Sequence, residues 1–499
     1  MKINRATGIV AVFALAAGAL LAGLGSVHFH PLFQSAAKPH RYAAGRASPA
    51  WKPPFLSGVI EGFYGPSWSV ADTLAIMRFE RAHHMNTFLY APKYDPYSRI
   101  DWREPYPSAA FAKLRALIKG ARVSGIRFVY SVSPGLNITY SSQQDRAALL
   151  AKINQVRGAG VNEFMLSLDD IAGNLNAADN RRYHGNLAWA EADLANYVWN
   201  QERRLDPHFR LLLAQTDYYG LTDNAFWTTL KHRLSPAVTP IWTGSWALSQ
   251  TITVRQVATV ERDMGHRVLI WDNYPVNDFT YVINKHPELF MGPLVGRGAG
   301  VPSLVAGYLF NPMIQARASE IALWTAGAYL ANPAHYDPAQ AWRQAIRAIG
   351  GPASGALALF AADNSSYFDE NLQPPRLAAD MSAFWHERAS GADLAKTPLA
   401  RDFAAMSAVN GTLAARLPDH ALYKEIAPWA RLLSFQGSAG LYAISALQTA
   451  GKHSLSSARR AVILRDLDQL RRNPLITAGA VTQNFLAAVL STSDPPAAG

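Results

Sequence analysis

Eight short apolar segments alternate with helix-like segments over residues 55–330, and this alternation most limits what the chain can fold into. Strands that alternate strictly with helices form a parallel sheet. Eight units over about 275 residues match a (β/α)8 barrel in number and size. An open doubly wound sheet is the alternative, but no glycine-rich nucleotide loop follows the first segment. The apolar segments are residues 55–63, 85–92, 126–135, 163–171, 209–218, 239–244, 267–275 and 304–313.

The chain after the eight units has a different pattern. Residues 331–490 are rich in Ala, Leu and Arg, and their apolar side chains recur every three or four residues, which is the spacing of a buried helix face. The fold class expected is therefore α/β, with a (β/α)8 TIM barrel at 55–330 followed by an all-α helical bundle at 331–490. The tail, 491–499, is expected to be disordered. The helical spacing is clearest at Tyr423, Ile426, Trp429 and Leu433, and at Leu464, Leu467 and Leu470.

The N-terminus has the pattern of a targeting segment. Lys2 and Arg5 precede an apolar run from Ala6 to about Val27, which is long for a signal peptide and close to the roughly 20 residues that span a bilayer. Residues 1–30 are therefore expected to be a signal peptide or an N-terminal membrane anchor, and residues 31–54 a linker. Either form predicts export, so that the body is secreted, periplasmic or anchored to the cell membrane.

Composition excludes several classes of protein. The net charge is +11, but five cations and no acid lie in residues 1–50, which leaves +6 for the remainder. No basic stripe or nucleic-acid motif is evident, so no nucleic-acid partner is expected. The chain has no cysteine, which removes disulfides, thiolate metal sites and cysteine nucleophiles. No HExxH motif occurs, and neither a metal nor a cofactor is expected.

Two adjacent acids, Asp169 and Asp170, follow the most apolar part of the fourth segment. Carboxylates next to a buried strand are costly unless they have a use. Because they repel each other when held close together, we expect one to keep its proton near neutral pH while the other ionises. A protonated acid beside a carboxylate anion suits acid–base catalysis. The simpler alternative is that the two acids bind a metal ion or cap a helix in a turn.

Polar residues end the other apolar segments as well. In a (β/α)8 barrel the loops after the strands form the active site, so these residues should meet at one end of the barrel. A tryptophan, two asparagines, a lysine and a carboxylate pair are typical of a sugar site, because aromatic faces stack on pyranose rings while amides and charges bind hydroxyls. The strand-end residues are Gly62, Lys93, Tyr218, Thr243, Trp271, Asn273 and Asn311.

Eight motifs follow one another along the barrel region: GVIEGFYGPSW (58–68), YAPKYDPY (90–97), WREPYP (102–107), SPGL (133–136), LDDI (168–171), WDNYPVND (271–278), GPLVGR (292–297) and NPM (311–313). Together they resemble glycoside hydrolase family 84, which holds the O-GlcNAcases and the hyaluronidase-like bacterial β-N-acetylglucosaminidases. The resemblance covers about 55–330 and extends loosely to about 490. It implies a barrel followed by a helical domain, and a retaining exo-β-N-acetylglucosaminidase.

The family resemblance also implies roles for individual residues. Most retaining glycosidases use a second carboxylate as nucleophile, but substrate-assisted enzymes use the 2-acetamido oxygen of the substrate and form an oxazoline. By resemblance, Asp169 accepts the acetamido N–H and Asp170 is the general acid and base. The sugar-binding residues implied are Gly62, Lys93, Asn273, Asp278 and Asn311 for the hydroxyls, Tyr218 for the acetamide, and Thr243 and Trp271 for the walls of its pocket.

One position departs from the family pattern. The family commonly has an acidic pair after the lysine of the second strand, whereas here Tyr94 precedes Asp95. This difference affects how that loop meets substrate and leaves the two proposed catalytic acids untouched.

Two other functions stay open at the level of the sequence. One is an endo-acting, hyaluronidase-like glycosidase, and the other is a surface sugar-binding protein without activity. All three interpretations predict a glycan partner, which for the exo-enzyme is a glycan or glycoprotein with terminal β-linked GlcNAc.

Overall fold

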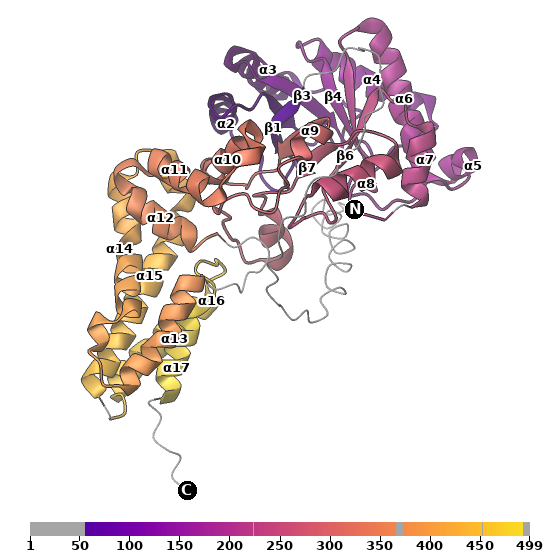
Figure 1. Cartoon of the computed structure of the whole chain (residues 1–499). Helices are drawn as coiled ribbons and strands as arrows, with labels where there is room; N and C mark the ends of the chain where they lie inside the picture. Colours follow the sequence, from indigo (N-terminus) through magenta and orange to yellow (C-terminus); the bar gives the residue numbers. More distant parts are fainter. Residues whose placement is uncertain (1–54, 223, 366–373, 452, 493–499) are drawn as a thin grey trace, which may run out of the picture.

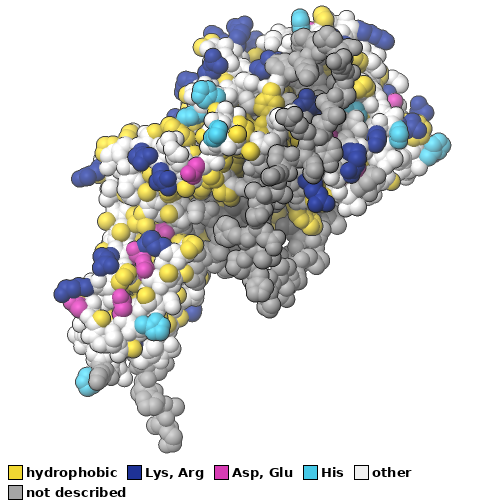
Figure 2. Space-filling model, viewed as in Figure 1, with side chains coloured by type: hydrophobic (Ala, Val, Ile, Leu, Met, Phe, Trp, Pro, Cys, Tyr) yellow, Lys and Arg dark blue, Asp and Glu magenta, His cyan; other side chains and the backbone are white. Residues whose placement is uncertain are grey.

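The computed structural model describes residues 55–222, 224–365, 374–451 and 453–492. These residues form a barrel and an elongated helical region beside it (Figure 1). The expected targeting segment and the linker lie outside the described residues, and so does the expected tail from residue 493 onward. Ser491 and Thr492, which were predicted to begin that disordered tail, instead end the last helix that the structure describes. Lys and Arg side chains are scattered over the visible face of both parts (Figure 2).

Eight parallel strands close into a barrel in sequence order, with β8 pairing back to β1. Each of the eight apolar segments predicted from the sequence overlaps one strand, which confirms the (β/α)8 fold and excludes the open sheet. The strands are β1 (Leu56–Glu61), β2 (Thr87–Tyr90), β3 (Arg127–Val132), β4 (Glu163–Ser167), β5 (Arg210–Ala214), β6 (Val238–Trp242), β7 (Leu269–Asp272) and β8 (Gly307–Phe310).

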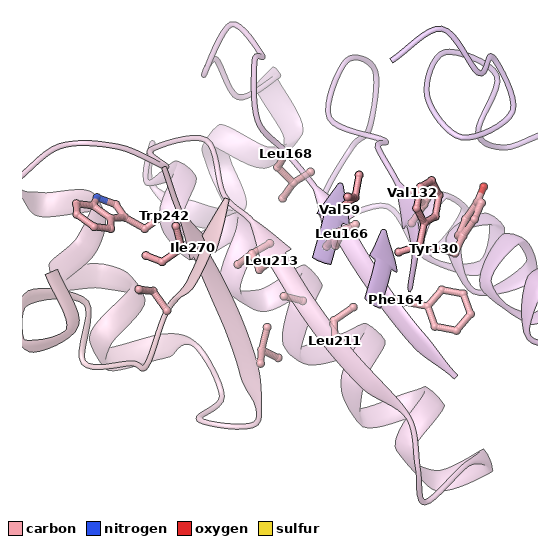
Figure 3. Close-up of a cluster of buried hydrophobic side chains, with 14 of the residues drawn as sticks. Val59, Tyr130, Val132, Phe164, Leu166, Leu168, Leu211, Leu213, Trp242 and Ile270 are labelled. Carbon is pink, nitrogen blue, oxygen red and sulfur yellow. The ribbon is translucent and has the colours of Figure 1, made fainter. Parts of the chain in front are cut away.

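Both faces of these strands are buried, which explains why the segments read as nearly continuous apolar runs. In β4, Phe164 and Leu166 belong to the large outer core under the helices, whereas Met165 belongs to a separate inner cluster that holds strand and strand-end side chains. Figure 3 shows outer-core side chains such as Val59, Phe164 and Leu213 between the strands and the helices.

Helices follow the strands around the outside of the barrel and begin with side-chain caps at several positions. Ser142 caps α4, and Thr253 caps α8 with a full capping box to Gln256. The helices are α2 (Val70–Ala82), α3 (Ser108–Ser124), α4 (Gln143–Arg157), α5 (Ala177–Tyr183), α6 (Leu187–Leu205), α7 (Ala225–Arg233), α8 (Val254–Met264), α9 (Val301–Leu304) and α10 (Ala316–Ala331).

The connection between β7 and β8 differs from the others because its helices are short. It contains a π-helical turn, η1 (Thr280–Asn284), and the four-residue α9. The rest is loop, and it contains the motifs WDNYPVND and GPLVGR. This connection therefore brings several motif residues to the carboxyl end of the barrel.

The C-terminal region is helical, as expected, and is attached to the β7–β8 connection. The indole N–H of Trp429 donates to the carbonyl of Pro287 at 3.0 Å, and Leu289, Phe290 and Met291 share one core with the bundle. The helices are α11 (Pro338–Gly350), α12 (Ser354–Ala362), α13 (Pro375–Ala389), α14 (Pro398–Arg416), α15 (His420–Ala450), α16 (Ser457–Arg472) and α17 (Val481–Thr492), with short 3-10 turns at η2 (Pro333–His335), η3 (Gly351–Ala353) and η4 (Leu394–Lys396).

One stretch of the described residues, Pro338–Ala362, is long and apolar enough to cross a membrane by length and composition. It consists of α11, η3 and α12 rather than one continuous helix. Its residues Ala345, Leu357 and Phe360 belong to the core of the bundle, which accounts for the apolar composition.

The expected buried face of α16 needs one correction. Leu467 and Leu470 are buried, but Leu464 is 46% exposed, and Ile463 takes its place in the core. Residues 463, 467 and 470 follow the four-then-three spacing of one helix face, whereas residue 464 lies a further 100° around the helix.

This neighbouring pair gives a matched test of the bundle. Ile463→Ala should lower the free energy of unfolding of the helical region by about 2–5 kcal/mol, because it leaves a cavity in the core. Leu464→Ala should change it by less than about 0.5 kcal/mol. Urea unfolding followed by helical circular dichroism measures both, and equal effects would contradict the assigned face.

Candidate active site

The two acids predicted from the sequence lie just after β4, where the strand geometry ends. The ladder continues to Leu168, whose N–H donates to the carbonyl of Ala214 at 2.7 Å. Asp170 then adopts a left-handed backbone, with φ of 54°, a conformation that aspartate tolerates better than most residues. Consecutive residues of a regular strand point to opposite sides, so this turn allows the carboxylates of both Asp169 and Asp170 to approach Lys93.

Lys93, from the loop after β2, lies between the two carboxylates. Its ammonium forms an ion pair with Asp169 Oδ2 and lies 3.7 Å from Asp170 Oδ2. Lys93 and Asp169 are both buried, whereas a quarter of the Asp170 side chain is exposed. The lysine therefore separates two negative charges that would otherwise repel each other directly.

The prediction that one of the two acids keeps its proton named neither acid, and the groups around Asp170 act against protonation of that residue. Burial alone would raise the pKa of Asp170, but the Lys93 ammonium, the Tyr218 hydroxyl, Arg99 and the Tyr64 hydroxyl together hold it below its ordinary value. Sequence reasoning considered only repulsion between the two acids, whereas the fold adds two cations and two hydroxyl donors.

Two tyrosines bind Asp170 directly. The Tyr218 hydroxyl donates to Oδ1 at 2.8 Å and the Tyr64 hydroxyl donates to Oδ2 at 3.1 Å. Arg99 donates to the Tyr64 hydroxyl at 3.1 Å. Tyr64 and Arg99 were not among the predicted site residues. The EGFYG motif could have indicated Tyr64. Arg99 lies outside the motifs, and only the turns after β2 bring it to the Tyr64 hydroxyl.

A second hydrogen-bonded group close to Lys93 connects the ends of β1, β7 and β8. Asn273 Oδ1 accepts from the Trp271 indole at 2.8 Å and from Asn311 Nδ2 at 2.9 Å. Asn311 Oδ1 in turn accepts from the Gly62 N–H at 3.2 Å. A Cβ on Gly62 would lie 2.3 Å from Trp271 Cζ2, so only glycine allows this approach. Lys93 Nζ lies 5.5 Å from the Trp271 ring centroid, which places this group and the acid pair in one site.

Asp278 and Thr243 complete the predicted set. Asp278 Oδ2 accepts from the Tyr64 N–H at 2.7 Å, and burial raises the pKa of Asp278 to about 6 although the backbone N–H groups of Tyr64 and Phe279 lower it. Thr243 is buried, and its N–H donates to the Tyr218 carbonyl at 3.0 Å. Its hydroxyl donates to the Trp246 carbonyl at 3.1 Å. All ten predicted residues are thus linked through contacts at one end of the barrel.

The departure at Tyr94 lies outside this network. Tyr94 is 45% exposed, whereas the next residue, Asp95, is buried and accepts from the hydroxyls of Tyr90 at 2.9 Å and Tyr106 at 2.5 Å. The second acid of the usual pair therefore serves the packing of the loop. The tyrosine at the first position, Tyr94, therefore changes the protein surface and leaves Asp169 and Asp170 unaffected.

The acid next to Asn273 is not available for chemistry. Asp272 is buried and forms a two-pronged ion pair with Arg297, at 2.6 and 2.8 Å, while the Tyr308 hydroxyl donates to it at 2.7 Å. Arg297 also donates to the carbonyls of Ser249 and Gln250. This pair, which sequence reasoning missed, anchors the loop after β6 to the end of β7.

No cluster of three or more His, Asp or Glu side chains in the described part of the chain could hold a metal ion.

Comparison with known proteins agrees with this geometry. The chain matches the β-N-acetylglucosaminidase family over residues 57–362, more than half of its length. Rat protein O-GlcNAcase is 32% identical over 289 residues, 57% of this chain and 31% of the rat protein, and the mouse protein is 32% identical over 277 residues, 54% and 29%. The match thus spans about a third of the length of these relatives.

Solved structures are similar over most of the chain. A mutant of the O-GlcNAc hydrolase of Thermobaculum terrenum has a TM-score of 0.78 and 27% identity, with 87% of this chain and 94% of that chain covered. A structure described as CpGH84B has a TM-score of 0.75 and 25% identity, with coverage of 88% and 77%. The chain belongs to the β-N-acetylglucosaminidases of glycoside hydrolase family 84, as the sequence motifs, the closed barrel and these relatives together establish.

Proposed function

We propose that the protein is a retaining exo-β-N-acetylglucosaminidase that removes terminal β-linked GlcNAc by substrate-assisted catalysis. The observation that carries this proposal is the pair Asp169 and Asp170, which the left-handed backbone of Asp170 brings together around the ammonium group of Lys93. Two neighbouring acids can serve two neighbouring parts of one sugar, the 2-acetamido group and the glycosidic oxygen.

Asp169 is suited to bind the acetamido group. Its Oδ2 is paired with Lys93, whereas its Oδ1 is buried and has no hydrogen-bond partner among the described residues. A buried acceptor without a partner costs about 1–3 kcal/mol. The substrate N–H supplies the missing donor, orients the acetamido oxygen toward the anomeric carbon, and becomes positively charged as the oxazoline forms, next to the Asp169 anion.

Asp170 is suited to transfer the proton. As the acetamido oxygen bonds to the anomeric carbon, the bond from that carbon to the leaving oxygen breaks and the Asp170 proton moves to that oxygen. The Asp170 carboxylate then takes a proton from water, which attacks the anomeric carbon and reopens the oxazoline with net retention. When the Tyr218 hydroxyl turns from Asp170 to the acetamide, Asp170 loses a donor that lowers its pKa, so substrate binding favours the protonated acid.

Neighbouring carboxylates are engaged elsewhere, which disfavours a conventional protein nucleophile. Asp272 is paired with Arg297, and Asp278 accepts backbone N–H groups.

Asp278, Asn273 and Asn311 are assigned to the sugar hydroxyls, with Trp271 and Thr243 as walls of the acetamide pocket. An endo-acting hyaluronidase would release oligosaccharides rather than GlcNAc, and an inactive sugar-binding protein would release neither.

We also propose that the protein is exported, with residues 1–30 as signal peptide or membrane anchor. Support comes from Lys2, Arg5 and the apolar run that follows. A periplasm-active reporter fused after residue 50 should function outside the cytoplasm, and deleting residues 1–30 should abolish this. Reporter activity confined to the cytoplasm would contradict export.

The proton-transfer role predicts a dependence on the leaving group. Asp170→Asn should lower kcat/KM by about 10²–10⁴-fold for alkyl or sugar leaving groups, which need protonation. The loss should be much smaller for an activated aryl glycoside, and the basic limb of the pH profile, which reports loss of the Asp170 proton, should disappear. The surface variant Asp468→Asn is the control. An equal loss for both leaving groups would remove Asp170 from the acid role.

The nucleophile can be tested with fluorinated substrates. If the acetamido oxygen attacks, the rate should fall steadily from acetyl through mono-, di- and trifluoroacetyl, because fluorine withdraws electron density from that oxygen. Asp169→Asn should lower turnover even with a good leaving group and should weaken an oxazoline mimic, since Asp169 stabilises the charged intermediate. A flat series, or a glycosyl group trapped on Asp169, would indicate a conventional protein nucleophile.

A further inference from the structure

Two exposed aromatic side chains form a stacked pair in the loops that carry the site residues Tyr218 and Thr243. Tyr219, in the loop after β5, is 36% exposed, and Trp246, in the loop after β6, is 60% exposed. Their ring centroids are 6.1 Å apart and their planes differ by 24°. Together the two rings present an apolar aromatic surface that none of the roles assigned above uses.

The exposure of Trp246 does not come from a loose loop. Its N–H donates to Ser249 Oγ at 3.0 Å, and its carbonyl accepts from Ser249 Oγ at 2.9 Å and from Thr243 Oγ1 at 3.1 Å. Ser249 is buried. The backbone is therefore fixed on both sides while the indole extends into solvent, an arrangement that leaves a large apolar ring in water.

The two loops that carry the pair are joined to each other. The N–H of Thr243 donates to the Tyr218 carbonyl at 3.0 Å and that of Gly220 donates to the Gly244 carbonyl at 2.9 Å. The Trp242 indole donates to the Gly220 carbonyl at 3.0 Å. The rings are thus held in a fixed relation, and these backbone groups bond to each other instead of to a ligand.

The pair is connected to Asp170 through Tyr218. The Tyr219 ring packs against the Tyr218 ring, with centroids 5.3 Å apart, and the Tyr218 hydroxyl is 2.8 Å from Asp170. In the proposed reaction Asp170 gives its proton to the leaving oxygen. The group attached to that oxygen therefore leaves the pocket next to Tyr219 and Trp246.

We propose that Tyr219 and Trp246 form a binding platform for the sugar that follows the scissile bond, so that the substrate is an N-acetylglucosaminide of a hexopyranose. The inference rests on the proposed function and adds the leaving group to it. A flat aromatic surface fits the apolar C–H face of a pyranose ring. An extended peptide would instead need free backbone donors and acceptors, and those in these loops are largely bonded to each other.

The test compares three substrates that share the GlcNAc and differ in the leaving group: a GlcNAc-β-1,4-GlcNAc disaccharide, the methyl β-glycoside, and a serine glycopeptide. Trp246→Ala should lower the ratio of kcat/KM for the disaccharide to that for the methyl glycoside by about 3- to 10-fold, the value of one aromatic contact. Trp246→Phe, which keeps a ring, should restore most of the ratio. Tyr219→Ala should act in the same direction.

Leu205→Ala is the matched control, because Leu205 is 60% exposed and ends α6 directly before β5, at the opposite end of the barrel. It should leave the ratio unchanged. An unchanged ratio in Trp246→Ala, or a loss confined to the glycopeptide, would overturn the platform while leaving the hydrolase intact. A wild-type protein inactive on all three substrates would instead contradict the proposed function.

Discussion

A buried lysine between two aspartates is the interaction on which the rest of the site depends. Lys93 pairs with Asp169 and stands 3.7 Å from Asp170, and its positive charge is the largest of the influences that lower the pKa of Asp170. Leaving one member of a buried ion pair alone costs about 3–5 kcal/mol. The arrangement therefore holds both carboxylates in place, and it leaves Asp169 Oδ1 as a buried acceptor without a partner among the described residues.

The closed barrel makes this arrangement possible because it brings the ends of distant strands to one place. Lys93 follows β2 and the acids follow β4, while Trp271 lies next to the last residue of β7, with its ring centroid 5.5 Å from Lys93 Nζ. Close packing of β1 against Trp271 requires glycine at position 62. The site is thus a consequence of barrel closure, and a small change in strand packing would move several of its groups together.

The β7–β8 connection links the site to the helical region. Asp278 and Arg297 face the barrel end from this connection, and the Pro287 carbonyl accepts from Trp429 of α15. Leu289, Phe290 and Met291 lie in the core of the bundle. The bundle therefore supports, from outside, the same segment that supplies proposed sugar-binding groups such as Asp278, which gives a physical reason for a helical domain beside the barrel.

Apolar periodicity, a local property, was enough to predict the eight strands and the helical region after them. The ten candidate residues came from the polar residues at the strand ends and, for Asp278 and the role of each residue, from the resemblance to glycoside hydrolase family 84. The sequence by itself did not determine the direction in which the pKa of Asp170 shifts, since repulsion between the two acids was visible while Arg99 and the hydroxyls of Tyr64 and Tyr218 were not. The sequence also led us to place Leu464 on the buried face of α16, where the structure has it exposed. It could not show that Asp272 forms an ion pair with Arg297 or that Tyr219 stacks on Trp246. These features depend on side chains from different strands and loops, and only the tertiary structure decides which of them meet.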